Sequence, residues 1–169
     1  SDHGNIVSDL ATGWELSVDG LNWEFDIRDD ARWHDGSDVT ANDLEFTLDR
    51  VINPPDELAV GRAGTVTGYV SSATQTNVVG LHTLRVSTDF PAASFLANLA
   101  RVYVSAYPET ATTALDSPTM TLPEQVVGSG PFKYAESIRG SFYRFTRNDD
   151  YYEPALPYLD GVTYLVMPS

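Results

Sequence analysis

Two runs of alternating apolar and polar residues, joined by an Asp-Gly pair, constrain the fold of this chain more than any other feature. Every second residue is apolar in residues 14–18, and residues 23–27 repeat the pattern. A period of two is typical of a strand that buries one face. Asp19-Gly20 lies between the runs and suits a tight turn, because glycine tolerates positive φ. The sequence therefore predicts a β-hairpin whose apolar side chains are buried, Trp14 and Trp23 included.

A helix is predicted next, over the residues that follow Thr40. Thr40 and Asp43 have the spacing of a capping box, with a carboxylate at the positive end of the helix. The apolar residues that follow recur at helical spacing and form one stripe, namely Leu44, Leu48, Val51 and Ile52. Asn53-Pro54-Pro55 ends the pattern, since a residue before proline avoids helical geometry.

The rest of the chain alternates short strands with one short helix. Strands are predicted at 76–79, 83–88 and 162–166, a helix at 95–99, and a second hairpin from 132–136 and 142–147. Strands outnumber helices and pair locally. The predicted fold class is α+β, with a mostly antiparallel sheet and short helices.

Charge and composition restrict the classes of partner. The net charge is −14 over 169 residues, so phosphate backbones and anionic lipid surfaces are repelled and nucleic acid is not an expected partner. The chain has no cysteine, which excludes disulfides and thiolate metal sites. No apolar run approaches the roughly 20 residues that span a bilayer.

Two short motifs could suggest chemistry, and both are interpreted as structural. His34 and Asp35 lie in the run Trp33-His34-Asp35-Gly36, but adjacent side chains on a turn diverge, so we interpret the run as a turn. The run from Gly128 to Pro131 lacks the Lys-Ser/Thr continuation of a phosphate loop, so its glycines are expected to permit a tight backbone crossing between subdomains. No catalytic residue, metal ligand or cofactor is predicted, and we expect no enzyme.

Several segments, taken in order, resemble one family. They are residues 10–25, 27–36, 39–48, 127–133, 147–152 and 157–162. Together they resemble the extracellular solute-binding proteins of family 5, which serve the peptide and nickel type of ABC importer. Ser129 stands where the family has threonine, and Tyr152 where it has tryptophan. The likeness covers nearly the whole chain and is weakest at about 54–78.

The resemblance implies a fold of the type II periplasmic binding proteins, in which two lobes close over a solute. It implies that the chain is a fragment of the N-terminal lobe, without the family's first strand or its lipidated or secreted leader. Residues 1–53 and 127–169 would be lobe portions with hairpins, and 54–126 a smaller subdomain with helices and strands. The solute would be an oligopeptide or dipeptide, handed outside the cytoplasm to the permease subunits of the importer. Membrane association would then come through the permease or a lipid anchor.

The family also suggests where the ligand would be contacted. By the resemblance, the segment after the helix at 95–99 faces the cleft, so Arg101 and Tyr103 are candidate ligand-binding residues. Tyr69 is a third candidate, since the family often has an aromatic residue between the two halves of the subdomain. Tyr103 or Arg101 would stack on the ligand or hydrogen-bond to it.

Two other function classes remain open at this point. A freestanding β-rich ligand- or carbohydrate-binding module would need an aromatic platform on one exposed sheet face. Trp14 and Trp23 lie among apolar residues, which favours burial over such a platform. An enzyme of unrecognised chemistry is the other alternative.

Overall fold

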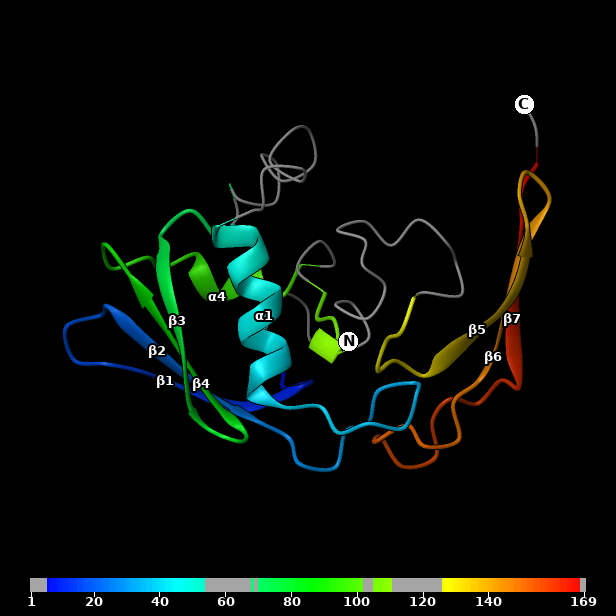
Figure 1. The fold of residues 1–169 in the computed structure, drawn as a ribbon, viewed down its shortest axis with the longest axis horizontal. Coiled ribbons are helices and arrows are strands. Elements are labelled where there is room, and N and C mark those ends of the chain that lie inside the picture. Colours follow the sequence, from blue (N-terminus) through cyan, green and yellow to red (C-terminus); the bar gives the residue numbers. More distant parts are fainter. Residues whose placement is uncertain (1–5, 54–67, 69, 102–104, 111–125, 168–169) are drawn as a thin grey trace. The chain divides into compact units, whose positions relative to one another are not determined.

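The structure is a computed structural model, and it describes residues 6–53, 68, 70–101, 105–110 and 126–167. The chain divides into two compact units (Figure 1). Unit 1 comprises Ser1–Asp29 and Thr40–Glu109, and unit 2 comprises Asp30–Val39 and Thr110–Ser169. The expected division into lobe portions at 1–53 and 127–169 and a subdomain at 54–126 refers to a complete two-lobed protein. It therefore stays a prediction. None of the helices in the described ranges is long and apolar enough to cross a membrane.

Unit 1 contains a four-stranded antiparallel sheet with the strand order β1-β2-β4-β3. The strands are β1 (Ala11–Leu16), β2 (Asn22–Ile27), β3 (Ala73–Gly80) and β4 (Thr83–Thr88). The predicted first hairpin is confirmed, and Gly20 adopts a φ of 74° in its turn. β2 pairs with β4, so the hairpin and residues 73–88 form one sheet.

The core of unit 1 lies on one face of this sheet. In register across it, Trp23 pairs with Val86 and Phe25 with Leu84, and all four side chains are buried. On the edge strand β1 the burial is incomplete. Trp14 is half-buried, whereas Leu16 is 47% exposed.

The expectation that Leu16 and Val18 are buried is therefore wrong. Leu16 pairs with Trp23 and shares its face, but it lies at the end of the outermost strand, where little chain covers it. Val18 lies in the turn, outside the pleat, and is fully exposed.

Helix α1 (Ala41–Ile52) contacts β3 and β4. The capping box is confirmed, because the carboxylate of Asp43 accepts a hydrogen bond from the Thr40 amide at 2.9 Å. Leu48 is buried and the other members of the predicted stripe are half-buried. The Thr76 hydroxyl donates to the Asp49 carboxylate at 2.8 Å, which ties the helix to β3. Pro54 and Pro55 lie outside the described residues.

The short helix α4 (Phe95–Leu99) contributes one large side chain to the same core. Phe95 is 1% exposed, and its ring lies 6.0 Å from that of Trp23 at an angle of 41°. The predicted helix at 95–99 is confirmed, with Phe95 as its buried residue.

Unit 2 contains a three-stranded antiparallel sheet with the order β5-β6-β7. Its strands are β5 (Phe132–Ile138), β6 (Phe142–Arg147) and β7 (Gly161–Leu165), so the second hairpin and the last strand are confirmed. Gly140 provides the positive φ, 76°, of the turn between β5 and β6. The antiparallel sheets and few helices of the two units agree with the predicted class.

Candidate functional site

Only one of the three residues predicted to contact ligand can be placed. Arg101 comes after Ala100, the residue that caps the end of α4; its backbone amide donates to the Asn98 carbonyl at 3.2 Å, and its side chain is exposed. Tyr69 and Tyr103 lie outside the described residues. The three therefore stay a prediction as a binding set.

Within unit 2, the structure joins two motifs that lie more than 90 residues apart in the sequence. The His34 amide donates to the Gly128 carbonyl at 2.7 Å, and the His34 ring binds the same segment through both of its nitrogens. Nδ1 accepts a hydrogen bond from the Gly128 amide at 3.3 Å, and Nε2 lies 2.9 Å from the Gly130 carbonyl oxygen. The turn at 33–36 and the glycine segment at 128–130 are thereby held together.

A third motif meets the same carbonyl. Asn148, which follows β6, is 1% exposed and donates from Nδ2 to the Gly130 oxygen at 3.0 Å. Its backbone amide donates to the Pro131 carbonyl at 2.9 Å. We call His34, Gly128, Gly130 and Asn148 the polar junction. It unites residues from the segments 27–36, 127–133 and 147–152, which carried the family resemblance.

Glycine at position 128 has a steric reason. A Cβ there would lie 3.3 Å from the Cε1 atom of His34, which is closer than side chains normally approach. The glycine thus permits a close approach between backbone and the imidazole ring within unit 2. The expected crossing between subdomains stays a prediction. The spacing of residues within neither motif indicates that it contacts the other.

The interpretation of His34 and Asp35 as a structural turn agrees with the geometry. The Gly36 amide donates to the Trp33 carbonyl at 2.8 Å, and Gly36 has a φ of 90°. The Asp35 carboxylate accepts from the amide and hydroxyl of Ser37 at 2.9 and 2.6 Å, whereas the His34 ring binds Gly128 and Gly130. The two side chains diverge and do not act on a common atom.

Burial is the main influence on the imidazole. It lowers the pKa of His34 below its ordinary value, although the bond to the Gly130 carbonyl acts in the opposite direction. The positive charge of Lys133 also lowers this pKa, and Asp35 raises it slightly. Burial tends to raise the pKa of Asp35, but the bonds from Ser37 outweigh it and lower the pKa.

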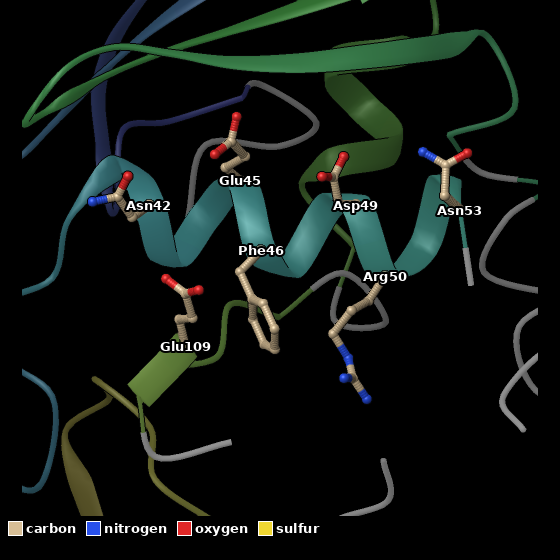
Figure 2. Close-up of a pocket in the computed structure, with 7 residues that line it drawn as sticks. All are labelled: Asn42, Glu45, Phe46, Asp49, Arg50, Asn53 and Glu109. Carbon is tan, nitrogen blue, oxygen red and sulfur yellow. The ribbon is translucent and has the colours of Figure 1, made fainter. Parts of the chain in front are cut away.

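A shallow hollow lies beside α1 in unit 1 (Figure 2). Its volume is about 420 Å³, and it is lined by Asn42, Glu45, Phe46, Asp49, Arg50, Asn53 and Glu109. Phe46 and Arg50 extend from one side of the helix and Glu45 and Asp49 from the other, so these groups do not converge. In the described part of the chain, no group of three or more acidic or histidine side chains could hold a metal ion.

The aromatic side chains of unit 2 bear on the carbohydrate-binding alternative. Tyr134, Phe145 and Tyr164 share one sheet face and form a row, with centroids 6.2 and 5.8 Å apart. Their planes meet at 80° and 85°, so neighbouring rings pack edge to face. Such a row does not offer the coplanar ring faces on which a sugar would stack. Trp23 is buried, as expected.

Comparison with known proteins identifies one family that this chain matches. The family described as bacterial extracellular solute-binding proteins, family 5 Middle, matches residues 5–169. The chain is 30% identical to an ABC transporter peptide-binding protein of Brucella ovis, over 87% of this chain and 27% of that protein. It is 28% identical to the periplasmic murein peptide-binding protein MppA of Escherichia coli, over 98% of this chain and 32% of MppA.

A solved structure supports the fold assignment. The periplasmic binding protein DppA of Helicobacter pylori, in complex with the peptide STSA, superposes with a TM-score of 0.85 at 25% identity. The match covers 97% of this chain and 34% of DppA. The chain thus spans about a third of the length of the relatives that it matches. With the family match over 5–169 and the polar junction built from its motifs, this chain belongs to the family 5 extracellular solute-binding proteins.

Proposed function

We propose that this chain is part of the solute-capturing subunit of an ABC importer, and that the solute is an oligopeptide or dipeptide. The observation that carries the proposal is the family match over nearly the whole chain, together with relatives named for peptide binding. In the proposed role the chain forms part of one lobe. The closed protein delivers its peptide to permease subunits outside the cytoplasm, and any membrane contact comes through them or through a lipid anchor.

The surface of unit 2 supports the idea that more protein covers it. The last strand and the residues next to it carry large exposed apolar side chains, with Tyr164 63%, Leu165 72% and Met167 85% exposed. Tyr164 and Leu165 are neighbours on β7 and lie on opposite faces of the sheet, so both faces carry exposed apolar side chains there. Large exposed apolar surface is typical of regions that another part of a protein covers. A second lobe and the remainder of the first would provide that cover.

Binding measurements test the proposal directly. A single half of a cleft cannot bury the roughly 70–90% of ligand surface that small-molecule sites bury. We expect di- to pentapeptides to bind a full-length protein containing this sequence at least about 100-fold more tightly than this chain alone. Isothermal titration calorimetry of both proteins measures the difference.

The outcomes separate the possible solutes. A nickel chelate titrated in parallel tests the other solute class that the family resemblance suggests. Tight binding of the chelate with no peptide binding would overturn the peptide assignment. Micromolar peptide binding by this chain alone would overturn its assignment as part of a cleft.

The candidate contacts Tyr103, Arg101 and Tyr69 are proposed as peptide-binding residues in the full-length protein. Arg101 is exposed, as a ligand contact must be before binding. For Tyr69 and Tyr103 the support is the family resemblance. Replacement of Tyr103 by alanine is expected to weaken peptide binding by about tenfold, the scale of one aromatic contact. Tyr158→Ala is the matched control, because Tyr158 is 83% exposed and lies far along the chain. Equal affinities for the two variants would refute the Tyr103 assignment.

A further inference from the structure

The hydrogen bonds of His34 determine which ring nitrogen carries the proton. The Gly128 amide has a hydrogen to donate, and it points at Nδ1, so Nδ1 must be unprotonated. The neutral ring then carries its proton on Nε2, which donates to the Gly130 carbonyl oxygen. The observed contacts are compatible with one protonation state, the neutral Nε2–H tautomer.

A second proton would break one of these bonds. The doubly protonated ring has donors at both nitrogens, and its Nδ1 hydrogen would point at the Gly128 amide hydrogen. The bond from Nε2 to Gly130 would persist, because it uses the proton that is already present. Acid would therefore release Gly128 selectively and leave the other attachments of the polar junction in place.

Among the charged groups that influence the His34 ring, Asp35 alone favours the imidazolium, and its influence is the weakest. Lys133, at the start of β5, disfavours a positive charge on His34, and the carboxylate of Asp35 is bound to Ser37. On the turn after β6, Asp150 pairs with Lys133 at 3.5 Å and Asp149 pairs with Arg147 at 3.1 Å. On the loop of His34 itself, Arg32 pairs with Asp38.

We propose that His34 is an acid-sensitive latch, which holds the Gly128–Gly130 segment to the turn at 33–36 when neutral and releases the Gly128 amide when protonated. This inference concerns the stability of unit 2 and stands apart from the identity of the solute. The Gly128–Gly130 segment leads into β5. The latch therefore makes the conformational order of the residues just before this strand depend on the pH.

The direction of the pH dependence follows from the lowered pKa of His34. A histidine with a folded-state pKa below its unfolded value of about 6.5 stabilises the fold fully above that pH. The stabilisation is lost as the pH falls through the folded-state pKa. The lowered pKa of Asp35 keeps that carboxylate charged throughout this window.

Amide hydrogen exchange of the intact 169-residue chain, followed by NMR between pH 7.5 and 4.5, tests the latch. After correction for intrinsic exchange, protection of the Gly128 amide is expected to fall by about tenfold, the scale of one hydrogen bond. The Asn148 amide, which binds the Pro131 carbonyl, should change much less. The ¹⁵N shifts of the His34 ring should report the Nε2–H tautomer at neutral pH.

Substitutions at two histidines provide the controls. His34→Asn places an amide oxygen close to the position of Nδ1, where it can accept the Gly128 hydrogen without titrating, so Gly128 protection should not depend on pH. His82→Asn changes the other histidine in the described residues, and it should keep the wild-type pH dependence. An unchanged Gly128 amide in the wild type, or an equal fall in His34→Asn, would overturn the proposal. A ring carrying its proton on Nδ1 would also overturn it.

Discussion

Replacement of Phe95 by alanine is expected to lower the free energy of unfolding of unit 1 by about 3–5 kcal/mol. Phe95 is 1% exposed and packs against the ring of Trp23, which itself pairs with Val86 in the middle of the sheet. Truncation removes the buried ring and leaves a cavity that the rigid sheet cannot close. The substitution also removes the buried side chain through which the short helix α4 packs on this core.

Phe90 offers a matched control for this substitution. It is the same residue type five positions earlier, and it is 53% exposed, so Phe90→Ala should change the free energy of unfolding by less than about 0.5 kcal/mol. Hydrogen exchange of the β2 and β4 amides reports on unit 1 separately from unit 2. Phe95→Leu, which keeps an apolar side chain, gives a measurable value if the alanine variant does not fold. Similar losses for Phe90→Ala and Phe95→Ala would contradict the packing described here.

The local elements could be predicted because their signals are local. The alternation around Asp19-Gly20 fixes a hairpin through a period of two and a turn residue with positive φ. The helix at 41–52 follows from its capping box and its apolar spacing. In each case the pattern and the structure it indicates lie within about 20 residues.

Features that depend on distant partners could not be predicted in the same way. The periodicity of β2 shows which face is buried, but not that β4 would be its second neighbour. It also does not show that the edge position of β1 would leave Leu16 exposed. The polar junction is a clearer case. The sequence around His34 predicts only a turn, whereas in the structure the Gly128 amide donates to the ring of His34.

The family resemblance identified the right segments without explaining them. Residues 27–36, 127–133 and 147–152 resemble the family's motifs in their order and their residue types. The structure supplies a physical reason for three of those residues, because His34 and Asn148 both bind the Gly130 carbonyl. The proposed ligand contacts have no comparable explanation, because Tyr69 and Tyr103 lie outside the described residues.

Asp43 holds the start of α1 with both carboxylate oxygens. Oδ2 accepts from the amide and hydroxyl of Thr40 at 2.9 and 3.0 Å, and Oδ1 accepts from the Glu109 amide at 2.9 Å. The side chain is 7% exposed, so water cannot easily replace it. Thr47 acts in parallel, because its hydroxyl accepts from the Tyr107 amide at 2.9 Å. The segment that contains residues 107–109 is thereby fastened to one face of the helix.

Replacement of Asp43 by alanine is therefore expected to cost about 2–4 kcal/mol, since it removes a helix cap and leaves the Thr40 and Glu109 amides without their charged acceptor. Asp43→Asn keeps one oxygen acceptor and should lose about half as much. Asp89, an exposed aspartate of the same unit, is the control, and Asp89→Ala should cost less than about 0.5 kcal/mol. The exchange rates of the α1 and Glu109 amides distinguish the two roles of Asp43. If only the exchange rates of the α1 amides change in Asp43→Ala, the bond to Glu109 does not fasten the segment. The loss in the free energy of unfolding should then be less than half of the expected value.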